Sequence, residues 1–273
     1  MISSESIEKY KGKTVVIKYG GAAMETPELK AGVMADVAAL AKSGARVVIV
    51  HGGGKELTAL LKKTGKESVF VDGLRVTDAE TRDFAMMVFC GKINKELASL
   101  LSQNGVRGVG ISGVDAGCVL VSQKDARLGY VGKVEEVDTY LIETLTDAGC
   151  VPVISSMGIG KDGGIYNVNA DTVAGSVAAS LKADVLIMMT DISGVCRDPK
   201  DSSTVIPAIT LSEAEELKKS GVISGGMIPK TECCTDAIKS GVGRVYITDG
   251  RVEHSVLSSL CGGNACGTVF LPD

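Results

Sequence analysis

Hydrophobic residues follow two alternating patterns along this chain. Consecutive, mostly β-branched hydrophobic residues are typical of buried strands. Such runs lie at 14–19, 46–50, 151–154, 185–189 and 244–248. Hydrophobic residues that recur every three to four positions are typical of helices with one buried face. Such segments lie at 27–44, 79–103, 139–148, 170–181, 211–220 and 229–240. The alternation predicts an α/β protein whose mainly parallel sheet is covered on both faces.

Shorter patterns fill the intervals between these segments. A helix with Leu57, Leu60 and Leu61 on one face should follow a glycine turn. We also expect short strands at 109–111, 119–121, 128–137 and 268–271, an extended or hairpin segment at 68–75, and a hairpin turn at 162–164. No repeat or linker divides the chain, so we expect one domain over 1–273, in which any division into lobes is functional.

Composition narrows the class of protein. The chain is 45% hydrophobic and 23% charged, which is normal for a globular domain. Its net charge is −4 and it has no block of Lys and Arg, which argues against a nucleic-acid partner. No apolar run reaches the roughly 20 residues of a membrane span. The polar residues 1–13 do not form a signal peptide. We therefore expect a cytoplasmic protein without a membrane partner.

The cysteines do not form a recognisable metal site. There is no C-x-x-C pair, and the two histidines, His51 and His254, lie far apart in the sequence. Zinc sites usually combine such ligands at short spacings, so we expect no protein-bound metal. We expect buried free thiols in a reducing compartment. The eight cysteines are Cys90, Cys118, Cys150, Cys196, Cys233, Cys234, Cys261 and Cys266.

Three predicted strands end in glycine-rich turns, at Gly20-Gly21, Gly52-Gly53-Gly54 and Ser193-Gly194. Ligands of parallel sheets collect at the carboxyl ends of the strands. There, glycine lets backbone N–H groups and a helix N-terminus approach an anion. Neither Gly12-Lys13-Thr14, which precedes its strand, nor Gly54-Lys55, which is followed by glutamate, fits a Walker phosphate loop. The turns predict a site for a polyphosphate or for two anions.

Two lysines occupy unusual positions. Lys18 interrupts a run that should be buried, so it needs an anionic partner unless its strand lies at a sheet edge. Lys230 lies at the start of a helix, where the dipole disfavours a cation unless an anion binds there. The alternative for Lys230 is an ordinary exposed lysine. The segment 167–171 (NVNAD) has more polar groups than a helix cap requires, although Asn169 could serve as the cap alone.

Six motifs in order resemble those of the amino-acid kinase family, over about residues 13–270. They are Val16-Ile17-Lys18-Tyr19-Gly20-Gly21, Val50-His51-Gly52-Gly53-Gly54, Gly73-Leu74-Arg75-Val76-Thr77-Asp78, Asn167-Val168-Asn169-Ala170-Asp171, Thr190-Asp191-Ile192-Ser193-Gly194 and Gly225-Gly226-Met227-Ile228-Pro229-Lys230. The third and fourth are most similar to the branch that phosphorylates N-acetyl-L-glutamate. The resemblance implies a three-layer fold with an open, mainly parallel eight-stranded sheet between helices.

The resemblance also implies a reaction. ATP would phosphorylate the side-chain carboxylate of N-acetyl-L-glutamate to the acyl phosphate, the second step of arginine biosynthesis. A lobe of about residues 1–180 would bind the acyl amino acid and form the dimer, and a lobe of about 181–273 would bind ATP. Mg²⁺ would be carried on the ATP phosphates.

The same resemblance assigns roles to individual residues. Lys18 and Lys230 would neutralise the transferred phosphoryl group, and Asp171 would organise both lysines. The amides of Gly21 and Gly53 would contact phosphoryl oxygens. Arg75 would bind a substrate carboxylate, and Asn167 the acetylated amine end. Substrate-binding residues are then Gly53, Gly54, Arg75, Asn167 and Asn169, and ATP-binding residues are Gly20, Gly21, Asp191, Ser193 and Gly194.

Family members that arginine inhibits carry a long N-terminal helix that links dimers into a hexamer. Here 13 residues precede the first predicted strand, and Ser6 to Tyr10 resemble only the end of that helix. We therefore expect a homodimer, in contact through the helix at 79–103, with weak or absent arginine inhibition.

Two other functions stay open. A sister kinase for aminoadipate, glutamate, aspartate, carbamate or uridylate is disfavoured by the Gly-Leu-Arg-Val-Thr setting of Arg75. A non-catalytic nucleotide-binding sensor is disfavoured by the presence of both Lys18 and Lys230.

Overall fold

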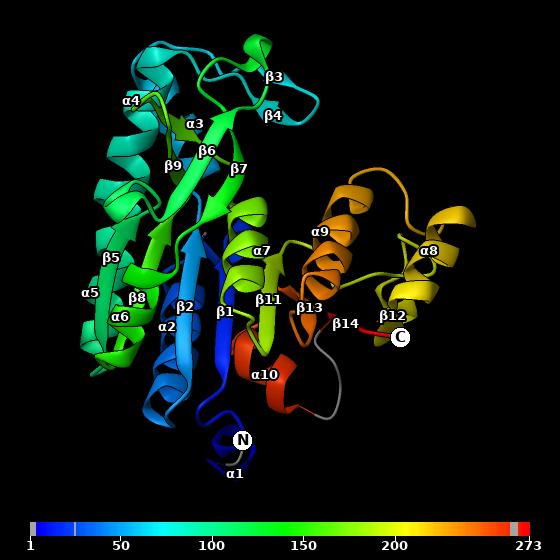
Figure 1. The fold of residues 1–273 in the computed structure, drawn as a ribbon. Coiled ribbons are helices and arrows are strands. Elements are labelled where there is room, and N and C mark those ends of the chain that lie inside the picture. Colours follow the sequence, from blue (N-terminus) through cyan, green and yellow to red (C-terminus); the bar gives the residue numbers. More distant parts are fainter. Residues whose placement is uncertain (1–3, 25, 263–266) are drawn as a thin grey trace.

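The computed structural model describes residues 4–24, 26–262 and 267–273, and its central element is an open sheet (Figure 1). Its eight strands are, in spatial order, β12 (Ala208–Thr210), β14 (Gly267–Leu271), β13 (Val245–Asp249), β11 (Val185–Thr190), β1 (Thr14–Tyr19), β2 (Arg46–His51), β8 (Cys150–Ser155) and β5 (Arg107–Ser112). The six strands from β13 to β5 are parallel, whereas β14 pairs antiparallel with β13 and parallel with β12. The predicted mainly parallel eight-stranded sheet is confirmed.

Helices cover both faces of this sheet. The first layer contains α1 (Ser4–Glu8), α2 (Pro27–Lys42), α5 (Asn94–Gln103) and α10 (Ser255–Cys261). The second layer contains α6 (Tyr140–Asp147), α7 (Ala170–Ser180), α8 (Leu211–Lys219) and α9 (Met227–Lys239). The short helix α3 (Gly54–Lys63) follows β2 at the carboxyl edge. The expected three-layer arrangement is therefore present.

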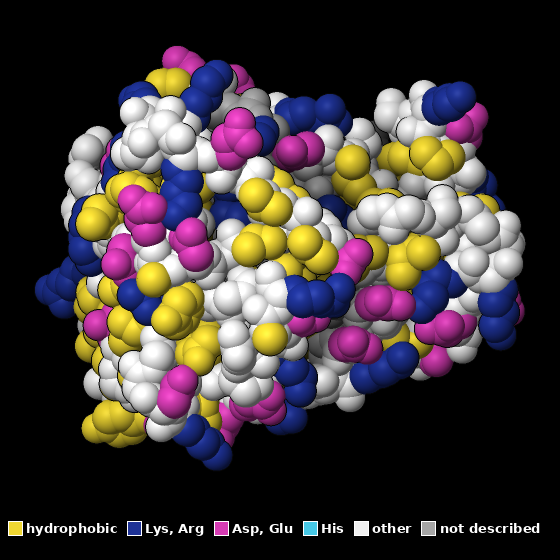
Figure 2. All heavy atoms as spheres, turned by 90° about the horizontal axis from the view of Figure 1, so that it is seen from above, with side chains coloured by type: hydrophobic (Ala, Val, Ile, Leu, Met, Phe, Trp, Pro, Cys, Tyr) yellow, Lys and Arg dark blue, Asp and Glu magenta, His cyan; other side chains and the backbone are white. Residues whose placement is uncertain are grey.

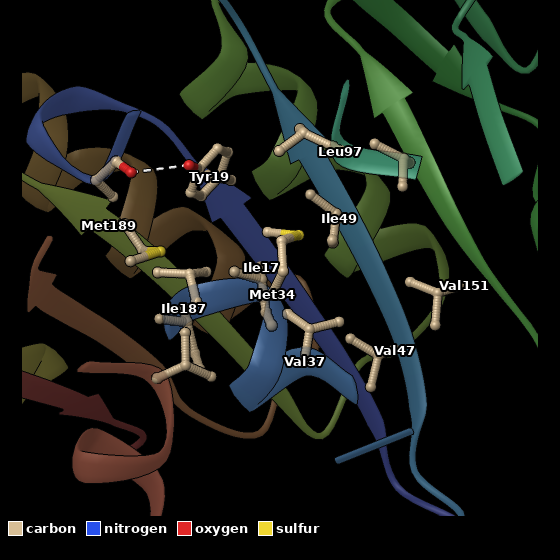
Figure 3. Close-up of a cluster of buried hydrophobic side chains, with 14 of the residues drawn as sticks. Ile17, Tyr19, Met34, Val37, Val47, Ile49, Leu97, Val151, Ile187 and Met189 are labelled. Atoms are coloured by element: carbon tan, nitrogen blue, oxygen red, sulfur yellow. Dashed lines mark hydrogen bonds between the residues drawn. The ribbon is translucent and has the colours of Figure 1, made fainter. Parts of the chain in front are cut away.

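Strand alternation assigns the side chains of β1 to opposite faces. Ile17 and Tyr19 pack in the layer of α2, where Met34 and Val37 lie against them (Figure 3). Val16 packs in the opposite layer, beneath α7. Lys18 has the same parity as Val16, so its side chain is directed to the α7 face. Burial of the apolar neighbours thus fixes where this lysine points.

The long helix predicted at 79–103 is continuous but not uniform. It comprises α4 (Ala79–Met86), a π-helical segment η2 (Met87–Ile93) and α5. Asp78 caps α4, because its carboxylate accepts a hydrogen bond from the Thr81 amide at 2.8 Å. A π-segment is wider than an α-turn and often marks a functional site. The hydrophobic periodicity did not predict it.

A second sheet of four strands was not predicted as a separate layer. In spatial order it contains β10 (Ile165–Asn167), β9 (Met157–Gly160), β6 (Val119–Gln123) and β7 (Gly132–Val137). The strand expected at 128–137 begins only at Gly132, because 126–128 form a 3-10 turn and Gly129 has a φ of 68°. The segment expected to be extended or a hairpin at 68–75 forms a hairpin from β3 (Phe70–Val71) and β4 (Leu74–Arg75). Figure 1 shows both additions beyond the carboxyl end of β2.

The cysteines correct one expectation. The seven within the described residues are free, but only Cys118 and Cys234 are buried. The other five are half-buried at element surfaces, so the expectation of buried thiols is wrong for them. Cys266 lies outside the described residues. In the part of the chain that the structure describes, no three His, Cys, Asp or Glu side chains are grouped as metal ligands, and no helix could span a membrane.

Candidate active site

A cleft of about 740 Å³ opens at the carboxyl ends of β1 and β2. Seen from above, this face is hollowed and Lys or Arg side chains lie within the hollow (Figure 2). Eight of the predicted site residues line the cleft. They are Lys18, Gly20, Gly21, Gly53, Gly54, Arg75, Asn169 and Asp171.

Lys18 is held by an anionic partner inside the molecule. Its strand lies between β2 and β11, so the edge-strand alternative is excluded. Its side chain is only 11% exposed, and Nζ lies 2.9 Å from Oδ1 of Asp171. Nζ also donates a hydrogen bond to the Met189 carbonyl at 3.1 Å. The lysine therefore lies at the floor of the cleft with its charge compensated.

Lys230 approaches the same carboxylate from the first turn of α9. Its Nζ lies 3.5 Å from Oδ2 of Asp171. Burial of Asp171 favours the neutral acid, but the charges of Lys18 and Lys230 outweigh it and lower the pKa of the Asp171 carboxyl below its ordinary value. The structure therefore brings together two cations that lie far apart in the sequence, one on each carboxylate oxygen. Lys230 is not an ordinary surface lysine.

The polar segment before α7 divides into separate roles. Asn169 caps the helix, because its Oδ1 accepts hydrogen bonds from the amides of Asp171 at 2.8 Å and Thr172 at 3.1 Å. The capping alternative thus holds for Asn169, although it also lines the cleft. Asn167 donates to Oγ1 of Thr77 at 3.3 Å and does not line the cleft. Asp171 is the member that faces the lysines.

At the first two glycine turns, neighbouring groups occupy the space where a side chain would lie. Gly21 has a φ of 64°, and a Cβ there would collide with the carboxylate of Asp191. At Gly53 a Cβ would collide with Phe89 and Ile93 of η2. Both turns also line the cleft, where glycine-rich turns can present backbone N–H groups to an anion.

The third glycine turn has a different role. Gly194 has a φ of 133°, and a Cβ there would lie 2.7 Å from Oγ1 of Thr268 on β14. It packs against that strand and does not line the cleft. Ser193 shares the carboxyl edge of the sheet, where its hydroxyl donates to Asp249 at 3.3 Å. The sequence did not single out Asp249 or its ion-pair partner Arg251, 2.7 Å away.

Arg75 forms part of the opposite wall. Its guanidinium donates to Ser68, to the Gly54 carbonyl at 3.0 Å and to Oγ1 of Thr58 at 2.7 Å. It also stacks over the Phe70 ring, 4.7 Å from the ring centre. Burial lowers the pKa of Arg75 from its ordinary value, but a guanidinium with so high a pKa remains charged. The hairpin β3–β4 therefore holds a cation beside the glycine turn that follows β2.

Cys233 lies beside these charges without joining the chemistry. Its Sγ donates to the Asp171 carbonyl at 3.3 Å. Burial raises the pKa of the Cys233 thiol to about 12. A thiol that stays protonated is a poor nucleophile. Cys233 therefore packs behind the site and takes no part in the reaction.

His51 is a buried residue whose state the sequence did not indicate. Burial lowers its pKa to about 4, so the imidazole is neutral at pH 7. The unfolded chain has an ordinary histidine pKa near 6.5 and binds a proton between these values, whereas the folded protein does not. The contribution of His51 to stability is therefore complete above about pH 6.5 and is lost as the pH falls towards 4.

This difference predicts an acid-dependent loss of stability. Between pH 7 and pH 4.5, His51 should lower the free energy of unfolding of the wild type by about 2–3 kcal/mol. Urea denaturation at both pH values, on the wild type and on His51→Asn, measures the contribution. On acidification, the free energy of unfolding of His51→Asn should fall by about 2–3 kcal/mol less than that of the wild type. Equal losses in the two proteins would contradict a buried neutral imidazole.

Comparison with known proteins agrees with this geometry. The model of the amino acid kinase family matches residues 13–249. The chain is 48% identical to an acetylglutamate kinase of Brachyspira hyodysenteriae, over 98% of this chain and 93% of the relative. It is 49% identical to an acetylglutamate kinase of Caldanaerobacter subterraneus subsp. tengcongensis, over 97% and 89%.

Solved structures share the architecture. N-acetylglutamate synthase from Neisseria gonorrhoeae, complexed with coenzyme A and N-acetyl-glutamate, superposes with a TM-score of 0.85 at 26% identity. The match covers 99% of this chain, which spans 62% of the synthase chain. Carbamate kinase from Giardia lamblia bound to AMP-PNP shares the fold, with a TM-score of 0.71 at 21% identity, over 96% of this chain and 99% of that chain. This chain belongs to the amino acid kinase family.

Proposed function

We propose that this protein transfers the γ-phosphoryl group of ATP to the side-chain carboxylate of N-acetyl-L-glutamate, a step of arginine biosynthesis. The observation that carries the proposal is the pair of lysines, Lys18 and Lys230, on one buried carboxylate at the floor of a cleft. The relatives named acetylglutamate kinase, which are 43–49% identical over nearly the whole chain, support the choice of acceptor.

The reaction needs little covalent help from the protein. A carboxylate acceptor is ionised at pH 7, so no general base is required. Phosphoryl transfer depends on alignment and on neutralising the charge of the transferred group. Lys18 and Lys230 contact opposite oxygens of Asp171 and can turn their remaining N–H groups to a phosphoryl group between them. Asp171 keeps the two cations at a fixed separation.

The two substrates would enter from different sides. The acyl amino acid would lie in the cleft between Arg75 and the turn at Gly53 and Gly54, with Asn167 and Asn169 beyond it. ATP would lie across Gly20 and Gly21, towards the carboxyl ends of β11 and β13. Asp191, Ser193 and Gly194 belong to that edge. The division into a lobe of about 1–180 for the acceptor and one of about 181–273 for ATP stays a prediction, in which Gly20 and Gly21 of the first lobe would contact the ATP phosphates.

Mg²⁺ fits this site as a companion of ATP. Two acidic residues, Glu56 and Asp171, line the cleft, and the Asp171 carboxylate is already paired with two lysines. The described residues offer no cluster of three ligands for the ion. The phosphates of ATP would therefore hold the Mg²⁺, which would neutralise part of their charge. The cytoplasmic location stays a prediction.

A substrate panel tests the proposed function. ADP release would be measured with N-acetyl-L-glutamate, glutamate, aspartate, aminoadipate and carbamate, at saturating ATP and Mg²⁺. We expect turnover with N-acetyl-L-glutamate above all others. Turnover with a different acceptor would assign a sister kinase, and ATP binding without turnover of any acceptor would assign a sensor.

Arg75 gives a separate prediction on acceptor binding. Arg75→Lys should raise KM for N-acetyl-L-glutamate by about 30-fold, because a charge-assisted pair contributes about 2 kcal/mol and lysine cannot form it in bidentate geometry. The KM for ATP should stay within about 2-fold. Arg82→Lys is the matched control, because Arg82 stacks on Tyr130 and pairs with Asp83 outside the cleft. A larger effect on ATP than on the acceptor would contradict the role.

The homodimer also stays a prediction, for which one surface feature gives support. Met87 projects from the long helix with 62% of its surface exposed, and large exposed hydrophobic residues are enriched at interfaces. Light scattering of the purified chain measures the mass in solution, and an assay with added arginine measures inhibition, which we expect to be weak or absent.

A further inference from the structure

The imidazole of His51 links the glycine turn of the cleft to the helix beneath it. The ring is fully buried, and its Nδ1 lies 2.9 Å from the Gly52 carbonyl oxygen. A carbonyl oxygen can only accept, so Nδ1 must carry the proton. Nε2 then has a free lone pair and must accept. Its partner is the side-chain amide of Asn94, 3.1 Å away.

The orientation of Asn94 is fixed independently. Its Nδ2 also faces the carbonyl oxygens of Ile111 at 3.1 Å and Val153 at 2.8 Å. Its Oδ1 accepts from Nζ of Lys95 at 3.0 Å. The two hydrogens of the Asn94 amide are therefore shared among three acceptors, which are Nε2 of His51 and the two carbonyl oxygens. In a flipped amide, Oδ1 of Asn94 would face those carbonyl oxygens. This arrangement agrees with the Nδ1–H tautomer of His51.

Asn94 thereby connects three strands to one helix. His51 ends β2, Val153 belongs to β8 and Ile111 belongs to β5, and these strands are neighbours in the sheet. Asn94 is the first residue of α5, directly after η2. A Cβ at position 110 would collide with Oδ1 of Asn94, and Gly110 has no Cβ. The sequence thus makes room for this amide on the sheet.

The same junction supports the next residue of the turn. Phe89 and Ile93, both in η2, occupy the space where a Gly53 side chain would lie. On the other side, a Cβ on Gly52 would lie 3.3 Å from that of Ala170, the residue before Asp171. A shift of the turn would therefore alter both its own N–H groups and the start of α7.

We propose that His51 and Asn94 are positioning residues, which hold the 52–54 turn on the π-segment so that its N–H groups face the phosphoryl group next to Lys18. This inference rests on the proposed function for the nature of the reaction. The neutral ring is suited to the task because it donates to Gly52 and accepts from Asn94 at the same time. A protonated ring would oppose the Asn94 amide with a second donor.

Two substitutions separate positioning from simple burial. Leucine has a volume similar to that of histidine and suits a fully buried site. His51→Leu therefore fills the same space but removes both hydrogen bonds. His51→Asn keeps an N–H group near the position of Nδ1. A misplaced reacting group can lower the rate by roughly 100-fold. We expect kcat to fall roughly 10- to 100-fold in His51→Leu and less in His51→Asn, with KM changed by less than 3-fold.

The matched control is His254→Asn at the other histidine, which pairs with Asp36; neither of these two residues lines the cleft. It should keep wild-type kcat. Thermal unfolding identifies variants that are folded. If folded His51→Leu is as active as His51→Asn or the wild type, the positioning role is overturned.

A spectroscopic test on the wild type decides the hydrogen-bond assignment even if His51→Leu does not fold. The sequence has two histidines, so ¹⁵N-histidine labelling and the His254→Asn spectrum assign the His51 signals. We expect a neutral Nδ1–H ring from pH 8 to pH 5. An Nε2–H tautomer, or titration near pH 6.5, overturns the proposal. Absence of kinase turnover in the wild type would instead contradict the proposed function and leave this readout unaffected.

Discussion

Replacing Lys18 by methionine is expected to lower kcat by about 100- to 1000-fold, while the protein remains folded. The loss corresponds to about 3–4 kcal/mol of transition-state stabilisation, which is typical for the removal of one preorganised electrostatic donor. Methionine has nearly the length of lysine and suits a site that is 11% exposed. Asp171 keeps Lys230 as a partner, so no carboxylate is left without a cation.

The measurement is a coupled ADP-release assay with N-acetyl-L-glutamate, together with thermal unfolding. Lys18→Ala and Lys230→Ala should show losses of the same order. Lys13→Met is the matched control, because Lys13 pairs with Asp184 on the surface and is 53% exposed. Its kcat should stay within about 2-fold, as for other surface ion pairs. Near wild-type kcat in folded Lys18→Met would contradict the catalytic role.

Much of the sheet could be predicted because its strands are uninterrupted hydrophobic runs. Such a run in β1 can be buried on both faces only in a central strand, and this made Lys18 conspicuous. Local patterns could not identify the residue that compensates it, and only the family resemblance pointed to Asp171. Asp171 lies 153 positions later by residue number, and its proximity depends on how α7 crosses β1. Pairing at that distance is set by topology, which local patterns do not encode.

The features that could not be predicted are those in which several structures satisfy one pattern. A π-turn and an α-turn bury similar residues, so periodicity did not distinguish η2 from the rest of the helix. Short strands such as β12 and β9 have too few residues to show an alternation. Glycine at the end of a strand can receive an anion, avoid a clash, or do both. A Cβ would collide with neighbouring groups at Gly53 and at Gly194, but only Gly53 also lines the cleft, and a single sequence does not show this difference.

His51 shows the same limit within a motif. The motif gave no role to His51, whose ring is buried in the sheet and remains neutral. Its partner, Asn94, lies within the helix predicted at 79–103, and the periodicity of that helix does not distinguish this amide from a surface one. A buried polar side chain is recognisable only when its acceptors are known. Coordinates supply this information and a single sequence does not.

The Asp171 carboxylate contributes both to stability and to catalysis, so its replacement should lower both. Asp171→Asn should lower kcat about 100-fold, because the amide turns a donor towards one of the two lysines and displaces it. It should also lower the free energy of unfolding by about 3 kcal/mol, since Lys18 would keep a charge in a nearly closed site without a counter-ion. Asp184→Asn is the control, because the surface pair with Lys13 contributes about 1 kcal/mol or less.

The acid dependence and a double variant distinguish these effects. The pKa of Asp171 is lowered in the folded protein, so its contribution to stability is present above the ordinary carboxyl pKa near 4. That contribution is lost as the pH falls through the folded value, and Asp171→Asn should lack it. Adding Lys18→Met to Asp171→Asn should restore part of the lost stability, because the unpaired buried charge is gone, but no activity. Strictly additive losses in the double variant would show that the two residues do not act as a pair.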